Sequence, residues 1–161
     1  MRKVIVSIFI ASAALVMFSC RSSKEALSLS SMNGEWNIIE INGSAVVPGQ
    51  GQQLPFIGFD TTTGKVYGYS GCNRIIGSVD VNAKPGTIDL GALGSTRMAC
   101  PDMTLEQNVL GALAQVKGYK KMGKENMALC NASNRPVVIL AKKAADVKVA
   151  DLQGEWKITD V

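Results

Sequence analysis

The stretches YGYSGCNR, residues 67–74, and GSTRMACPD, residues 94–102, each place a cysteine beside residues that favour turns. Segments with the composition of β-strands precede the first stretch, whereas apolar residues at helical spacing follow the second. The strand pattern therefore gives way to a helical pattern at the second stretch. The way in which these two stretches meet decides the fold.

Working outward toward the N-terminus, the sequence predicts strands at about 34–41, 55–60 and 65–71, with a tight turn at Asn42 and Gly43. In the last of these strands Tyr67 and Tyr69 occupy alternate positions, so both side chains lie on one face. A pair of tyrosines on one face could act as a stacking platform for a ligand. Packing in the core or along an edge is the alternative, and the more common arrangement.

Working toward the C-terminus, the residues from 74 to 82 and from 87 to 93 favour strands, and Ile88 and Leu90 should face the same way. Apolar residues at helical spacing then predict a helix over about 104–117, with Thr104 and Gln107 in the positions of a capping box. Three further strands are expected, within 119–122, 126–130 and 136–143, and the apolar run 136–140 should be an interior strand.

The first twenty residues have the pattern of a targeting segment. Arg2 and Lys3 precede an uncharged apolar run, residues 4–18, which is short for a membrane-spanning helix. Ser19 before Cys20 resembles the lipobox of bacterial lipoproteins, which implies acylation of Cys20 and removal of residues 1–19 as a signal peptide. A cleaved signal with an incidental cysteine is the alternative. The Ser-rich residues 20–31 are predicted to be a flexible tether, and the absence of Asp after Cys20 favours the outer membrane.

The last residues repeat an earlier stretch. NGEWNIIEI, residues 33–41, aligns with QGEWKITDV, residues 153–161, with Gly, Glu, Trp and one Ile identical. We interpret residues 144–150 as a linker and 151–161 as the first strand of a truncated second copy of the domain. The alternative is a native edge strand that adds to its own or another molecule.

Taken together, the G-x-W opening, YSGCNR, STRMAC, the following helix and the closing aliphatic strand resemble the META or HslJ-like domain family. The resemblance covers about residues 33–142, within a domain expected over 32–143. It implies an α+β fold, in which a curved antiparallel sheet or partial β-barrel carries one packed helix. It also implies a small envelope protein linked to stress response, with no catalytic residues to assign.

Within this framework Cys72 and Cys100, 28 positions apart in an exported protein, are predicted to form a disulfide. Cys130 would then be a buried free thiol or a competitor for a partner. Arg74 and Arg97, each beside one of these cysteines, are candidates for a cationic patch, although surface pairing with acidic residues is the simpler interpretation.

Composition excludes several functions. The chain contains no histidine, which rules out histidine-based triads, and it has no phosphate-binding loop. Once Arg2 and Lys3 are removed, 15 basic residues face 13 acidic ones, so the balance does not indicate nucleic-acid binding. The densest basic group, Lys117, Lys120, Lys121 and Lys124, is typical of a solvated helix end and turn. No metal or cofactor is expected, since the three cysteines that follow Cys20, without any histidine, make a poor zinc site.

The sequence therefore predicts a non-catalytic structural or interaction module, lipid-anchored in the bacterial cell envelope, with a role in stress tolerance and an envelope protein as its expected partner. The alternative is a binding protein that holds a small apolar ligand or a peptide at the barrel mouth, using Tyr67 or Tyr69.

Overall fold

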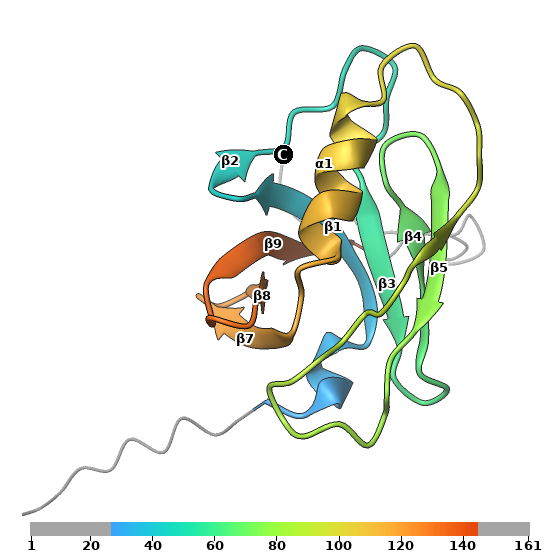
Figure 1. Ribbon diagram of the computed structural model, residues 1–161. Helices are drawn as coiled ribbons and strands as arrows, with labels where there is room; N and C mark the ends of the chain where they lie inside the picture. Colours follow the sequence, from blue (N-terminus) through green and yellow to red (C-terminus); the bar gives the residue numbers. More distant parts are fainter. Residues whose placement is uncertain (1–26, 145–161) are drawn as a thin grey trace, which may run out of the picture.

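The computed structural model describes residues 27–144, and Figure 1 shows them as a curled sheet with one α-helix across its open side. The elements follow in chain order: the 3₁₀ turn η1 (Leu29–Met32), β1 (Gly34–Ile41), β2 (Ser44–Ala45), β3 (Phe56–Asp60), β4 (Lys65–Tyr69), β5 (Arg74–Ser78), β6 (Gly94–Ser95), α1 (Thr104–Leu113), β7 (Gly118–Met122), β8 (Asn126–Cys130) and β9 (Pro136–Lys142).

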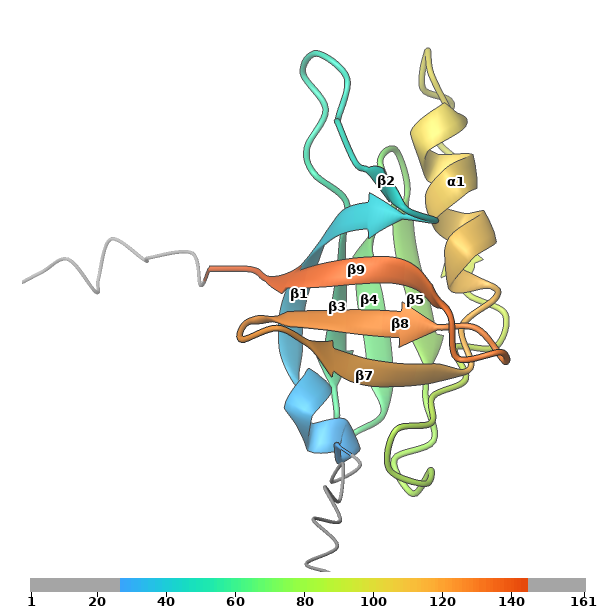
Figure 2. The same ribbon diagram turned by 90° about the vertical axis from the view of Figure 1, so that its left-hand side faces the viewer.

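All strand pairs are antiparallel, and the order across the sheet is β6-β5-β4-β3-β1-β9-β8-β7, with β2 paired to β1. The strands curl without closing into a full barrel, as the two views in Figures 1 and 2 show. Backbone hydrogen bonds between segment 86–88 and segment 117–119 bridge part of the remaining gap. The predicted α+β fold, a curved antiparallel sheet or partial barrel with one helix, is confirmed.

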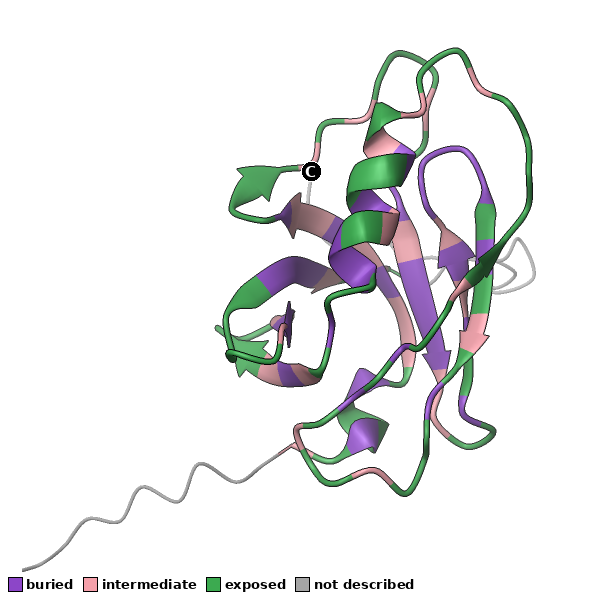
Figure 3. Cartoon of the chain, viewed as in Figure 1, coloured by how far each residue is buried: buried purple, intermediate pink, exposed green. Residues whose placement is uncertain are grey.

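The core lies inside the curl, where α1 covers it. Alternate residues of each strand face inward, so that Ile38, Ile57 and Val66 are fully buried. The inward side of α1 contributes Val109 and Leu113 to the same cluster, and Figure 3 shows this buried stripe facing the sheet while the outer side of the helix is exposed.

The turn at Asn42 and Gly43 is formed as predicted. Both residues have positive φ, of 50° and 83°, and they connect β1 to the two-residue strand β2. The interior position of the run 136–140 is also confirmed, since β9 lies between β1 and β8. Neither β2 nor β6 was expected, because two-residue strands carry no periodic signal.

Two predicted elements differ from the structure. The helix ends at Leu113 rather than near residue 117, because the chain must turn so that the Lys117 N–H can bond the Cys130 carbonyl at 2.8 Å. Residues 87–93 form a loop with a single bridge rather than a strand, because the Asp89 carboxylate accepts from the Gly91 N–H and bends the chain there. Ile88 and Leu90 are nevertheless both buried, as their alternation predicted.

The domain begins upstream of the boundary that the composition indicated. Leu29 and Met32 are buried and Leu27 packs against the core, so residues 27–31 are part of the folded body rather than of a tether. The Trp36 indole N–H donates to the Met32 carbonyl at 2.7 Å and fixes this turn against β1. The predicted signal peptide, Cys20 and the segment 151–161 lie outside the described residues.

Candidate functional site

The bend between β4 and β5 places the first cysteine. Gly71 has a φ of 119°, which L-residues rarely adopt, and a side chain there would approach Leu105 of α1. Both the backbone N–H and the hydroxyl of Ser70 donate to the Asn73 carbonyl, at 2.9 and 2.8 Å, and close the bend. The bend therefore presents Cys72 and Asn73 toward the helix.

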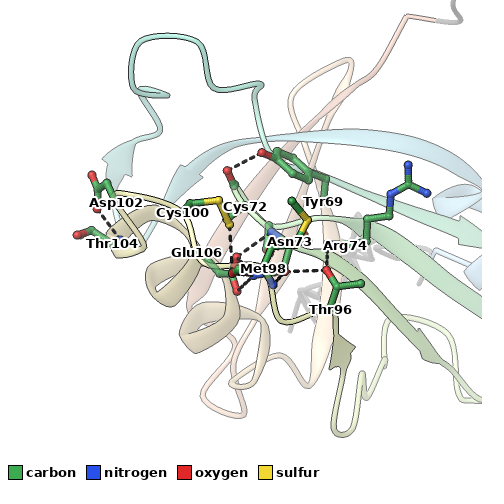
Figure 4. Close-up of a disulfide and its surroundings, with 12 residues drawn as sticks. Tyr69, Cys72, Asn73, Arg74, Thr96, Met98, Cys100, Asp102, Thr104 and Glu106 are labelled. Atoms are coloured by element: carbon green, nitrogen blue, oxygen red, sulfur yellow. Dashed lines mark hydrogen bonds between the residues drawn. A yellow bond between two sulfur atoms is a disulfide. The ribbon is translucent and has the colours of Figure 1, made fainter.

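Cys72 and Cys100 form the predicted disulfide, with their Cα atoms 6.1 Å apart (Figure 4). The bond joins the bend to the segment that enters α1. Cys130 is a free thiol, buried to 1% exposure beside Ala128 and Ile139. Burial raises the pKa of this thiol above its ordinary value. Of the two interpretations of Cys130, the buried free thiol is the one observed.

A buried polar network surrounds the disulfide, with Asn73 at its centre (Figure 4). The backbone N–H and the side-chain amide of Asn73 donate to the Glu106 carboxylate at 2.8 to 3.0 Å. The side-chain oxygen of Asn73, Oδ1, accepts from the Thr96 hydroxyl and the Met98 N–H, both at 2.7 Å. Asn73 and Glu106 are 1% and 5% exposed, so the network is shielded from water.

The sequence did not predict this network. Asparagine beside a bend commonly adopts a left-handed backbone, but the described non-glycine residues with positive φ are Asn42 and Asn134 and do not include Asn73. Its role instead comes from its side chain, which has both donors and an acceptor and can therefore bond two other segments, 96–98 and α1, at once. One sequence feature could have indicated the network: the GCN motif at residues 71–73 occurs together with an acidic residue, Glu106, in the first turn of the predicted helix.

The outer face of β3, β4 and β5 carries an open groove of about 1020 Å³, bounded at one end by the disulfide. Tyr67 and Tyr69 both line it, since their shared face points away from the core that contains Val66. Ile76 and Met98 also line it and are 62% and 63% exposed. The tyrosines therefore lie on the outer face of the sheet and not at the barrel mouth, where a binding function was expected to use them.

The tyrosines are held in place by neighbours on the same face. The Tyr69 hydroxyl donates to the Gly71 carbonyl at 2.6 Å. The Tyr67 ring lies across Gly58, where an added Cβ would come within 2.5 Å of the ring. Partial burial, and then the nearby Glu35 carboxylate, raises the pKa of Tyr67 above its ordinary value, so the phenol is neutral in the physiological range.

The charged residues of the groove favour an anion. Arg74 and Lys65 line it and form no ion pair within residues 27–144. Asp60 also lines it, but its carboxylate accepts from the Thr62 and Thr63 N–H groups and the Thr63 hydroxyl. The Thr63 side chain, followed by these backbone groups, lowers the pKa of Asp60.

Of the two arginines proposed as a patch, Arg74 lines the groove and Arg97 does not. Arg97 is exposed in the segment that leads to Cys100, and within the described part of the chain neither guanidinium pairs with a carboxylate. Pairing with surface acids, the simpler interpretation, is therefore not observed in this part.

No cluster of three or more potential metal ligands occurs between residues 27 and 144. None of the helices in the same range is long and apolar enough to span a bilayer.

The fold and the crosslinked junction define a small domain with an open curled sheet and one helix. The family model for the META domain matches residues 27–144, so the chain belongs to the META domain family. The match begins at Leu27, where the described fold begins.

Solved structures show the same fold. An NMR structure of a protein from Burkholderia xenovorans has a TM-score of 0.54 at 24% identity, covering 72% of this chain and 86% of that one. A second NMR structure has a TM-score of 0.51 at 19% identity, covering 76% and 94%. No curated protein sequence matches this chain significantly.

Proposed function

We propose that the protein is a lipid-anchored lipoprotein of the bacterial cell envelope, favouring the outer membrane, whose META domain is a non-catalytic interaction module in stress tolerance. The observation that carries the module is the groove on β3, β4 and β5. Exposed Ile76 and Met98 beside two tyrosines form an apolar surface of the kind that marks interaction sites. Arg74 and Lys65 add positive charge, which suits an acidic segment of an envelope protein.

The rigidity of the groove supports this role. The disulfide and the Asn73 network fix one end of it to α1, so little order remains to be gained on binding. Preorganised surfaces lose less conformational entropy on binding. A tyrosine pair held beside Arg74 and Lys65 therefore suits recognition of a partner better than a general packing role.

A second candidate function, binding of a small apolar or peptide ligand, rests on the size of the same groove. Its volume of about 1020 Å³ is at the upper end of the range of small-molecule sites, which is roughly 300–1,000 Å³. The two functions differ in what occupies the groove and so respond to different experiments.

Site-specific photocrosslinking in cells tests the module. A photoreactive residue at Ile76 should crosslink to one defined envelope protein, and Arg74→Ala should weaken the adduct. The matched control is a photoreactive residue at Val47, which is 81% exposed but outside the groove. Equal crosslinking from both positions would contradict the module. A shift in melting temperature with a compound or peptide, abolished by Tyr67→Ala, would favour the ligand-binding alternative.

The lipid anchor is tested separately by metabolic labelling with a palmitate analogue. The wild-type chain and Cys130→Ser should incorporate the label, whereas Cys20→Ser should not. Because the Cys20 variant also loses processing, labelling rather than sedimentation is the decisive measurement. An unlabelled wild-type chain would refute the lipoprotein assignment and leave the groove experiment unaffected.

A further inference from the structure

The end of the domain at which the chain enters the fold is firmly attached to the body. The Leu27 carbonyl accepts from the Gly86 N–H at 3.0 Å and from the Tyr119 hydroxyl at 2.6 Å. Seven peptide units separate Cys20 from Leu27, which spans at most about 25 Å when extended. With the proposed lipid anchor at Cys20, this end of the domain stays within that distance of the membrane.

Three lysines gather at the same end. Lys121 and Lys124 belong to the β7–β8 hairpin and Lys142 to the end of β9, and together they line a hollow of about 590 Å³ that also includes Leu27 and Trp36. In Figure 2 the turn η1 lies just below the ends of β7 and β8 from which this hairpin projects. Glu125 is the acidic residue on the rim, so positive charge predominates.

The four lysines of the densest basic group in the sequence, at positions 117, 120, 121 and 124, differ in their surroundings. Lys117 pairs with Asp89 at 2.6 Å, and Lys120 donates to the Asn134 carbonyl at 3.1 Å. Lys121 and Lys124 are exposed and form no ion pair within residues 27–144. Lys142 joins them from a distant part of the sequence, with its ammonium 4.4 Å from the centre of the Trp36 ring and 2.6 Å from the Asn33 carbonyl.

An exposed apolar side chain lies near the tip of the same hairpin, outside the lining of the hollow. Met122 is 45% exposed and stands between Lys121 and Gly123 at the hairpin tip. A hairpin tip that carries a flexible apolar side chain as well as Lys121 and Lys124 suits the headgroup region of a bilayer, where the thioether enters the acyl boundary and the ammonium groups reach phosphates. The charge and the exposed methionine thus point to the same type of surface.

We propose that Lys121, Met122, Lys124 and Lys142 form a membrane-docking surface for anionic phospholipid headgroups. This inference rests on the proposed lipid anchor, which places the surface next to the bilayer. A tether of seven residues keeps the local concentration of lipid around this surface high. A weak affinity of the surface for headgroups is therefore enough to orient the domain on the membrane. The groove on β3, β4 and β5 would then be presented in a fixed direction.

The test uses the mature chain, residues 20–161, with Cys20→Ser, so that the anchor plays no part. Co-sedimentation is measured with vesicles of phosphatidylcholine alone and with 30% phosphatidylglycerol. Binding is expected only to the anionic vesicles and should weaken steeply with salt. Replacing both Lys121 and Lys124 by Ala should lower the partition coefficient roughly 25-fold, since each lysine near an anionic surface contributes about fivefold. Met122→Ser should lower it several-fold at any salt concentration.

The matched control replaces Arg97 and Arg135 by Ala, which removes the same charge from exposed positions outside the hollow. Equal loss of binding in the control would show attraction by net charge alone and overturn the proposal. Absence of binding to anionic vesicles, or equal binding to neutral ones, would overturn it too. Circular dichroism confirms that each variant is folded. Palmitate labelling reports on the anchor independently, so failure of one experiment leaves the other informative.

Discussion

A single side chain organises the junction between sheet and helix. Asn73 bonds the Glu106 carboxylate on one side and the backbone of Met98 on the other, linking segments that lie 33 and 25 positions away in the sequence. Sequence patterns predicted the disulfide beside it because a segment that resembles a targeting signal and the spacing of the two cysteines can both be recognised in the sequence. They could not predict the network, because an asparagine at a bend has several local uses and no periodic pattern connects it to a helix.

The first prediction is that Asn73→Ala destabilises the domain by about 3 kcal/mol, because a buried carboxylate loses its side-chain donors while it remains desolvated. Urea denaturation monitored by circular dichroism measures the free energy of unfolding. Asn108→Ala is the control, since Asn108 is exposed on the same helix as Glu106 and should change stability by less than about 0.5 kcal/mol. Similar losses in the two variants would show that the network contributes little.

At the scale of secondary structure, the start of α1 illustrates what sequence patterns can and cannot specify. Its apolar stripe correctly predicted a helix from residue 104, but the capping box of Thr104 and Gln107 is not formed. Asp102 accepts from the Thr104 N–H at 2.8 Å instead, two positions earlier than the expected cap. Asp102 follows Cys100 by two residues, in a segment that the disulfide ties to the bend between β4 and β5. Such tertiary constraints are absent from a local pattern.

The second prediction concerns pH. Hydrogen bonding with the Thr104 side chain, followed by its backbone N–H, lowers the pKa of Asp102 below its ordinary value of 3.8. The folded state therefore favours the charged carboxylate. Its contribution is complete above about pH 5, where the carboxyl group is ionised in the unfolded chain as well, and is lost as the pH falls through the lowered pKa. Asp102→Ala should melt below the wild type at pH 7, and the two melting curves should converge in strong acid. A constant difference at every pH would exclude the carboxylate as the cause.

The third prediction concerns the crosslink between the bend and the helix entry. Opening a loop of 28 residues should lower the free energy of unfolding by about 3 to 4 kcal/mol in the chain-entropy model. The variant in which Cys72 and Cys100 are both replaced by Ala should show this loss in urea titrations and no further effect of reductant. The stability of Cys130→Ala, in contrast, should still fall when reductant is added.

A thiol count in denaturant without reductant tests the pairing itself. It should find Cys130 free and Cys72 and Cys100 protected; labelling of all three would contradict the pairing.

At the scale of the whole molecule, β1 is the strand on which the sheet depends, since it pairs with β2, β3 and β9. Each position that segment 153–161 shares with it has a definite structural role. Gly34 has a φ of 97°, Glu35 forms an ion pair with Lys143 at 2.6 Å, and Trp36 and Ile38 are buried. The positions that differ include Asn37 and Ile39, which are less buried. The repeat therefore preserves what a β1-type strand requires.

The final prediction follows from this correspondence. If residues 151–161 begin a second copy of the domain, the first copy is complete without them, because Lys143 already bonds Glu35 and β9 already pairs with β1 along its length. A chain ending at residue 144 should then have the melting temperature of the full mature chain within about 2 °C. Calorimetry on both chains, each with Cys20→Ser, measures the difference, and Trp156→Ala in the longer chain serves as a control for the role of the repeated tryptophan. A lower melting temperature for the shortened chain, reproduced by Trp156→Ala, would instead establish the segment as an edge strand that adds to this domain.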